Sequence, residues 1–162
     1  MITSIRKNTL LHIKYKEYTM KISQNIYNIL YRYPLSLLTI ATIIYLTLFY
    51  KSDDQTPTFQ HLDKIVHFTM YAGLCSVLWF EYLCSHKSIN FRNITLGAVV
   101  LPILFSGGLE VAQSTLTTTR KGDIYDFIFN TLGVLSAVAF SLYVTRPIIK
   151  KYHLYKKQIK ED

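Results

Sequence analysis

Four long apolar stretches, separated by short polar segments, dominate the pattern of the chain. They cover residues 34–50, 65–83, 94–109 and 127–145. The first contains 17 residues without a charge, which as a helix extend about 25 Å at about 1.5 Å per residue. A membrane-spanning helix needs about 20 mostly apolar residues. The pattern therefore predicts an all-α integral membrane bundle of four transmembrane helices.

The segments on either side of this bundle are polar and basic. In residues 21–33 apolar side chains recur every three or four positions, with polar side chains between them, which predicts a short amphipathic helix on the membrane surface. A disordered basic leader is the alternative. Residues 1–19 lack a steady period, and Met20 offers an alternative start, so they are assigned no function. We expect a basic N-terminal segment (1–33), a transmembrane domain (34–145) and a basic tail (146–162).

Small residues and one proline mark expected packing features of the third and fourth stretches. Pro102 predicts a kink in the third, and the pair Gly107–Gly108 predicts a close approach of another helix. Gly133, Ala137 and Ser141 form a stripe of small residues with a spacing of four. Such a stripe is typical of a tightly packed helix face in a membrane.

The distribution of basic residues predicts the orientation. Fourteen of the 18 Lys and Arg residues lie in residues 1–33, 84–93 and 146–162, and four lie in 51–64 and 111–126. By the positive-inside rule both termini are cytoplasmic, in a multi-pass protein of the bacterial cytoplasmic membrane. Membrane lipids are the expected partners. No nucleic-acid partner is expected, because the basic residues flank apolar stretches and do not line one folded face.

The two cysteines carry no chemistry that the pattern can identify. Cys75 and Cys84 lie in or beside an apolar stretch, without a Cys-x-x-Cys motif or a histidine at ligand spacing. They are interpreted as packing residues. Neither a disulfide nor a zinc site is predicted.

Polar residues gather where three of the stretches begin or end on the predicted outer side. Ionisable groups in a membrane cost about 2.5 to 3.5 kcal/mol at its centre and less near the interface, so they indicate a functional site. The candidate ligand-binding residues are Asp63, Lys64, His67, Tyr71, Glu110, Gln113, Arg120, Asp123, Asp126 and Asn130. The alternative is structural: Glu110, Arg120 and Asp126 pair with one another and hold three helices in register.

Two kinds of chemistry remain open for this cluster. His67, Glu110, Asp123 and Asp126 together offer ligands for a divalent ion. His67, Glu110 and Asp126 are candidate acid/base catalysts, because desolvation raises carboxyl pKa values and an imidazole titrates near neutrality. Nothing in the spacing fixes either arrangement, so no cofactor and no metal are predicted.

The order and spacing of these residues resemble the VanZ-like family of small bacterial membrane proteins. The resemblance covers residues 34–145 and rests on three short motifs at matching helix ends. The motifs are Asp63-Lys64-x-x-His67-Phe68-x-x-Tyr71, Glu110-x-x-Gln113 and Arg120-x-x-Asp123-x-x-Asp126-x-x-x-Asn130-Thr-x-Gly133. Thr118–Thr119 stand where the family often has Pro-Gly.

The resemblance implies a four-helix membrane protein of the cell envelope. The family takes its name from a member linked to teicoplanin resistance and has no settled reaction. We expect a protein that contributes to glycopeptide tolerance, with an outward-facing polar pocket that binds an envelope component, a lipid-linked precursor or a glycopeptide. An envelope enzyme acting on a lipid head group is the alternative. A small transporter is a weaker one, because the four stretches show no inverted repeat.

Overall fold

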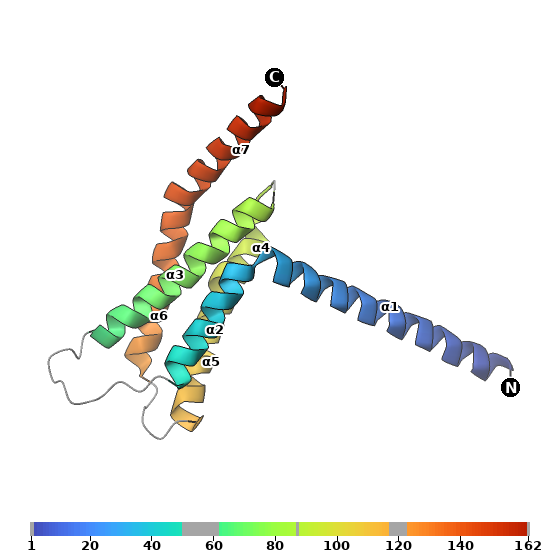
Figure 1. The fold of residues 1–162 in the computed structure, drawn as a ribbon. Coiled ribbons are helices and arrows are strands. Elements are labelled where there is room, and N and C mark those ends of the chain that lie inside the picture. Colours follow the sequence, from blue (N-terminus) through green and yellow to red (C-terminus); the bar gives the residue numbers. More distant parts are fainter. Residues whose placement is uncertain (1, 50–61, 87, 117–122, 162) are drawn as a thin grey trace. The chain divides into compact units, whose positions relative to one another are not determined.

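The computed structural model describes residues 2–49, 62–86, 88–116 and 123–161, and every regular element in these ranges is helical (Figure 1). The chain divides into two compact units, Met1–Pro34 and Leu35–Asp162. In chain order the elements are α1 (Ile2–Arg32), α2 (Pro34–Leu48), α3 (Leu62–Ser85), α4 (Phe91–Thr95), the π-helix η2 (Leu96–Val100), α5 (Leu101–Leu116), α6 (Ile124–Phe140), the π-helix η3 (Ser141–Thr145) and α7 (Arg146–Glu161).

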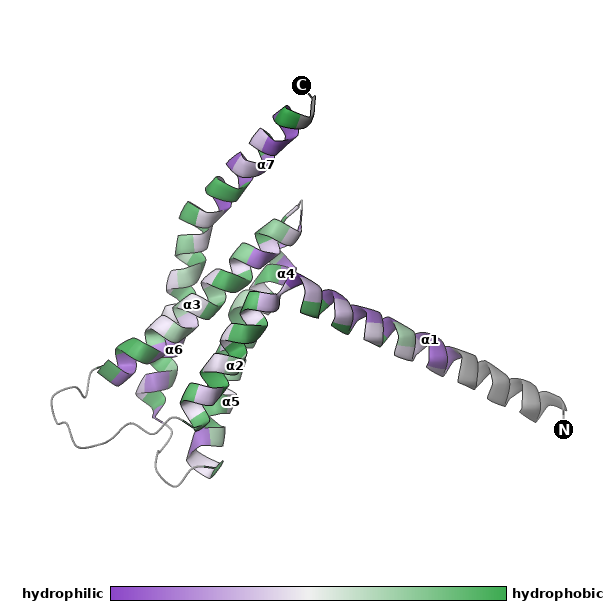
Figure 2. Cartoon of the chain, in the orientation of Figure 1, coloured by the Kyte–Doolittle hydropathy of each residue, from purple (hydrophilic) through white to green (hydrophobic). Residues whose placement is uncertain are grey.

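The first unit is one helix, α1, which is longer than the predicted amphipathic helix of residues 21–33. The helix begins at Ile2, so residues 2–19, which show no steady apolar period, are also helical. The structure therefore contains a helix here and not the alternative of a disordered leader. Much of its surface is hydrophilic (Figure 2), and Lys21 pairs with Glu17 one turn earlier at 2.7 Å. The helix ends before Pro34, in line with the steric restriction that a proline places on the residue before it.

Two helices of the second unit are long and apolar enough to cross a membrane by themselves. They are Phe91–Leu116, with 26 residues, and Ile124–Ile159, with 36. The segments Lys14–Arg32 and Pro34–Leu48 meet the same criterion only when they are taken together as one span. The described residues thus contain two or three candidate spans rather than the predicted four. The helix α2 has only 15 residues, and polar side chains lower the mean hydropathy of α3.

The apolar surface of these helices is typical of a membrane protein. In the first candidate span, only 33% of the most apolar segment is buried within the protein. In the second span the corresponding share is 28%. Most of these side chains therefore face outward, where contact with lipid would cover them. Figure 2 shows the hydrophobic colouring along α5 and α6.

Both long helices contain a π-helical segment immediately before a proline. The segment η2 ends two residues before Pro102, and η3 ends two residues before Pro147. A proline in a helix lacks an N–H donor and its ring collides with the carbonyl four residues earlier. The wider π turn is one of the local adjustments that relieve this conflict. The interruption predicted at Pro102 thus takes the form of a π segment, and beyond Pro147 the basic tail continues as the helix α7.

The predicted stripe of small residues is confirmed as the packing face between α3 and α6. A Cβ atom added at Gly133 would lie 2.4 Å from the backbone oxygen of Phe68 and 3.0 Å from the backbone nitrogen of Ala72. Ala137 and Ser141 are fully or almost fully buried on the same face. Only glycine permits this distance between the two backbones, which brings the polar residues of α3 and α6 within reach of one another.

The glycine pair behaves differently from the prediction. The side chain of Phe127 lies 3.4 Å from the Cβ position of Gly107, but no heavy atom lies within 4 Å of that of Gly108. The predicted close approach is therefore wrong for Gly108, which faces open space. The interpretation of the cysteines also holds in part. Cys75 is fully buried in the core, whereas Cys84 is exposed, and both are free thiols.

Glu81 occupies a place that the sequence did not indicate. It lies near the end of the second apolar stretch and is only 5% exposed. Its carboxylate accepts hydrogen bonds from the backbone nitrogens of Leu35 at 2.8 Å and Ser36 at 3.1 Å, and from the Ser36 hydroxyl. The first N–H groups of a helix have no partner within the helix and carry positive partial charge. Glu81 of α3 therefore closes the N-terminus of α2.

Replacing Glu81 with alanine should lower the free energy of unfolding by about 1 to 3 kcal/mol, because buried N–H groups lose their acceptor. Glu81→Gln should cost less, since one side-chain oxygen can still accept a bond. Thermal unfolding in detergent measures the effect. Glu17→Ala is the control, because this exposed carboxylate pairs with Lys21 of the same helix. Equal melting temperatures for Glu81→Ala and Glu17→Ala would contradict the capping role.

Candidate functional site

The N-terminal end of α3 supplies four of the predicted site residues. His67 and Tyr71, one helical turn apart, are 3% and 2% exposed. Lys64 is half-buried, and Asp63 is exposed at the start of the helix. Asp63, His67 and Tyr71 are four positions apart and so lie on one side of α3, and their burial increases from Asp63 to Tyr71.

The facing end of α6 supplies three more. Asp123 is the N-cap residue, and its Oδ1 accepts a hydrogen bond from the backbone nitrogen of Tyr125 at 2.9 Å. Asp126 and Asn130, on the inner face of the helix, are 5% and 1% exposed. The hydrogen bond from Tyr125, together with Lys64, lowers the pKa of the Asp123 carboxyl. The stabilisation from this cap is thus present above the ordinary aspartate pKa and is lost as the pH falls through the lower value.

A chain of polar contacts connects three helices through His67. Its Nδ1 lies 3.2 Å from Oδ1 of Asn130, and Nδ2 of Asn130 donates to the Ser106 hydroxyl on α5 at 2.8 Å. Because the amide oxygen of Asn130 can only accept, this contact places a proton on Nδ1. The other ring nitrogen, Nε2, then points toward Asp126 and Asp63, with its lone pair free in the neutral imidazole.

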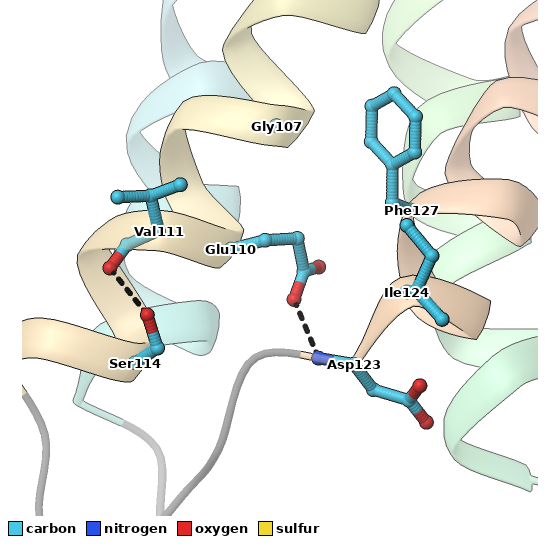
Figure 3. Close-up of a pocket in the computed structure, with 7 residues that line it drawn as sticks. All are labelled: Gly107, Glu110, Val111, Ser114, Asp123, Ile124 and Phe127. Atoms are coloured by element: carbon cyan, nitrogen blue, oxygen red, sulfur yellow. Dashed lines mark hydrogen bonds between the residues drawn. The ribbon is translucent and has the colours of Figure 1, made fainter.

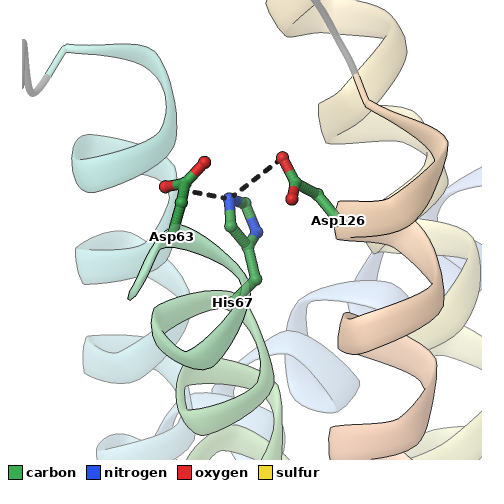
Figure 4. A group of neighbouring side chains, drawn as sticks. All are labelled: Asp63, His67 and Asp126. Atoms are coloured by element: carbon green, nitrogen blue, oxygen red, sulfur yellow. Dashed lines mark ion pairs between the residues drawn. The ribbon is translucent and has the colours of Figure 1, made fainter. Parts of the chain in front are cut away.

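Two carboxylates lie on the Nε2 side of His67. Nε2 is 3.7 Å from Oδ2 of Asp126 and 4.0 Å from Oδ1 of Asp63 (Figure 4). Lys64 lies beside the same group, with Nζ 3.4 Å from Oδ2 of Asp123 and 3.9 Å from Oδ1 of Asp126. The residues predicted from the ends of two separate apolar stretches therefore meet at one place.

Glu110 lies beside this cluster, at the wall of a cavity. Its Oε2 accepts a hydrogen bond from the backbone nitrogen of Asp123 at 3.3 Å (Figure 3). The cavity has a volume of about 350 Å³. Its lining combines two carboxylates with apolar and small residues of α5 and α6: Gly107, Glu110, Val111, Ser114, Asp123, Ile124 and Phe127. One polar edge and apolar walls suit an amphipathic ligand.

Not every predicted site residue joins the cluster. Gln113 is buried, but its Nε2 donates to the backbone oxygen of Thr47 on α2 at 3.2 Å. Tyr71 belongs to the buried core, where its ring centroid lies 6.4 Å from that of Phe105. Arg120 lies outside the described residues, so the predicted pairing of Glu110, Arg120 and Asp126 does too. Among the described residues, Lys64 and His67 are the basic side chains within 4 Å of the Asp126 carboxylate.

Ser106 is the member of the network that the sequence analysis missed. It lies in an apolar stretch without a charged neighbour, so composition gives no signal. Its spacing does give one, since Ser106, Glu110 and Gln113 fall at i, i+4 and i+7 and share one side of a helix.

Two of the four metal ligands considered from the sequence, His67 and Asp126, belong to the group that the structure gathers, and two do not. Asp123 caps α6, and Glu110 accepts a bond from its backbone. Asp63, His67 and Asp126 instead bring one possible ligand atom each within 4.8 Å of one another.

The comparisons with known proteins agree with the motifs. The chain matches the family model VanZ/LLP1 over residues 4–146. No curated protein and no solved structure gave a significant match. The match begins near the start of α1 and continues to the first residue of α7, so it includes the N-terminal segment that the resemblance of residues 34–145 left out. The chain belongs to the VanZ/LLP1 family of membrane proteins.

Proposed function

We propose that this protein binds a lipid-linked envelope precursor in the cavity beside Glu110 and in this way contributes to teicoplanin tolerance. The observation that carries the proposal is the lining of the cavity, which is apolar on one side and polar on the other. Val111, Ile124 and Phe127 line it with apolar surface, while Glu110 and Asp123 give it a polar edge. A polyprenyl chain can lie against the first set while its head group reaches the second.

The negative charge around the cavity means that an anionic head group would bind here together with a cation. Four carboxylates, Asp63, Glu110, Asp123 and Asp126, lie in the described cluster, against Lys64 and the imidazole of His67. Lys64 already contacts two of these acids at its Nζ atom. A bare phosphate would therefore be repelled, and a diphosphate head group needs a further cation to bind here.

We further propose that four helices cross the cytoplasmic membrane, with both termini in the cytoplasm. The 14 basic residues at the termini and in the 84–93 loop, against four in the other two loops, support this orientation. It puts the N-terminal ends of α3 and α6 and the cavity on the outer side, where lipid-linked precursors are used.

The second candidate is an envelope enzyme acting on the same head group. The observation in its favour is the setting of His67, because Asn130 holds Nδ1 and leaves Nε2 facing Asp126. An imidazole held in one tautomer beside a buried carboxylate is suited to accept and return a proton. Glu110 would be the second acid/base group.

A cysteine in the cavity tests both the orientation and the binding. In a background with Cys75→Ala and Cys84→Ser, Ser114→Cys should react with a membrane-impermeant maleimide added to intact cells. Ser88→Cys, in the loop assigned to the cytoplasm, should not react. In purified protein in nanodiscs, with a divalent cation in the buffer, a polyprenyl diphosphate should slow the labelling of Ser114→Cys severalfold, because the ligand covers the thiol.

Thr115→Cys is the matched control for the protection. Thr115 is exposed on the next position of α5 but does not line the cavity. Its labelling should be unaffected by the polyprenyl diphosphate. Equal slowing at both positions would indicate a general effect of the lipid, and labelling of Ser88→Cys alone from outside would reverse the proposed topology.

A further inference from the structure

We infer that Asp63, His67 and Asp126 bind a divalent metal ion between the N-terminal ends of α3 and α6. The ion would hold the phosphate of the head group, and this role rests on the proposed function. The site itself rests only on the arrangement of the three side chains.

The three side chains converge from two helices on one point. Asp63 and His67 lie one turn apart on α3, and Asp126 faces them from α6 (Figure 4). Nε2 of His67 is 3.7 Å from Asp126 Oδ2 and 4.0 Å from Asp63 Oδ1. Ligand atoms around a tetrahedral ion lie about 3.4 Å apart when each is about 2.1 Å from the metal. Small side-chain rotations, mainly of the exposed Asp63, bring the three atoms to this spacing.

The orientation of His67 is the one that a metal requires. Histidine binds a metal through a neutral nitrogen, and ligating histidines usually give their other N–H to an oxygen acceptor. Asn130 provides that acceptor at Nδ1, and Ser106 in turn fixes the Asn130 amide. The lone pair of Nε2 is therefore directed to the side where both carboxylates lie.

Asp126 gives an independent indication that a cation is needed. It is 5% exposed, and its Oδ1 has no hydrogen-bond donor among the described residues. Lys64 Nζ, at 3.9 Å from this oxygen, is beyond hydrogen-bond distance and lies closer to Asp123. A buried carboxylate without donors is costly, and metal coordination is one of the ways in which proteins compensate such a charge.

The ligand set limits the kind of ion. One imidazole and two carboxylates suit Zn²⁺ or Mn²⁺ better than a soft ion that prefers thiolates. Three protein ligands leave at least one coordination position open. Because Asp63 is exposed, a hydrated ion can reach the site, and the open position can accept a phosphate oxygen. The site would supply the further cation that the proposed head group needs in this acidic cluster.

Binding of Mn²⁺ to purified protein in nanodiscs tests the site. Electron paramagnetic resonance measures the free ion, and we expect one Mn²⁺ bound per chain. Asp63→Asn, His67→Gln and Asp126→Asn each remove a ligand and should raise the Kd at least about tenfold. Asn130→Ala removes only the partner of His67 and should weaken binding by about 10- to 100-fold. His153→Gln and Glu17→Gln, at exposed positions of α7 and α1, should bind as the wild type does.

Several outcomes would overturn the site: no bound Mn²⁺ in the wild type, or an unchanged Kd in all the ligand variants. Asp63→Asn is decisive if a buried substitution prevents folding, because Asp63 is exposed and its replacement leaves the core intact. The polyprenyl diphosphate assay separates the two proposals. Protection of Ser114→Cys without Mn²⁺ binding would refute the metal site and retain the proposed function. Mn²⁺ binding without protection, with or without the ion, would support the site and refute the function.

Discussion

Gly133→Ala should destabilise the bundle more than an alanine at any other described glycine. The added Cβ would lie 2.4 Å from the backbone oxygen of Phe68 and 3.0 Å from the nitrogen of Ala72. Both are backbone atoms of α3, so no rotamer change can relieve the contact and the two helices must separate. Overpacking of a well-packed core costs about 1 to 3 kcal/mol, and a contact with a rigid backbone belongs at the upper end.

Gly133→Ala should also disturb the polar cluster, because the residues of this cluster lie on α3 and α6. Separation of α3 from α6 lengthens the contacts of His67 with Asn130 and Asp126. The melting temperature of Gly133→Ala in detergent should therefore fall by several degrees, and Mn²⁺ binding should weaken with it. Gly108→Ala is the matched control, since nothing lies within 4 Å of its Cβ position and alanine favours a helix over glycine.

Gly108→Ala should melt at or slightly above the temperature of the wild type. If Gly133→Ala behaved in the same way, α3 and α6 would not approach as closely as described. The packing role of the small-residue stripe would then be wrong, whatever the polar cluster does.

The sequence allowed correct predictions where these depend only on which residues lie on the same side of one helix. The spacing of Gly133 and Ala137 correctly predicted a packed helix face, and the motif of Asp63, His67 and Tyr71, four positions apart, likewise falls on one side of a helix. Such predictions succeed because an α-helix fixes which residues lie on the same side, whatever surrounds it. The cluster of His67 with Asp126 could be anticipated because both faces are polar and lie at the ends of apolar stretches.

Contacts between distant segments could not be predicted in this way. Glu81 lies 46 positions from Leu35, and Gln113 lies 66 positions from Thr47, yet both pairs form hydrogen bonds. The register between two helices depends on how their side chains pack, and a periodic pattern within one helix does not contain it. From the sequence, Glu81 was therefore given no role, and Gln113 was assigned to the polar cluster.

The geometry also assigns different roles to polar residues that the sequence analysis had grouped as one site. Ten polar residues were proposed as one set of ligands. In the structure Asp123 caps a helix, Gln113 binds the backbone of α2, and Tyr71 is part of the buried core. His67 and Asp126 remain as the pair whose contacts no structural role fully explains, since Oδ1 of Asp126 lacks a hydrogen-bond donor among the described residues.

Asp126→Asn should therefore abolish the proposed contribution to teicoplanin tolerance while the protein remains folded. Expression of the wild-type protein in a sensitive Gram-positive host is expected to raise teicoplanin tolerance and to leave vancomycin tolerance nearly unchanged. Asparagine has the shape of aspartate but carries no charge, so it can neither pair with His67 nor bind a divalent ion well. Tolerance should fall to that of cells with an empty vector, at equal abundance in the membrane.

Stability should change little, because Lys64 keeps a second partner. Its Nζ is 3.4 Å from Asp123 and 3.9 Å from Asp126, so the substitution leaves the shorter contact in place. For a domain of this size about 1 kcal/mol corresponds to roughly 2 to 4 °C in melting temperature, and we expect a change no larger than this.

The double variant Lys64→Gln with Asp126→Asn separates a working site from a pair that only holds the helices together. If the pair is purely structural, Asp126→Asn alone leaves a lysine with one partner fewer and lowers stability, and the second change restores both stability and tolerance. If Asp126 belongs to a site, the double variant folds and remains inactive, because the ligand for the metal or head group is still missing. We expect the second result. Tolerance regained in the charge-neutral double variant, at wild-type abundance, would reduce the cluster to a contact between α3 and α6.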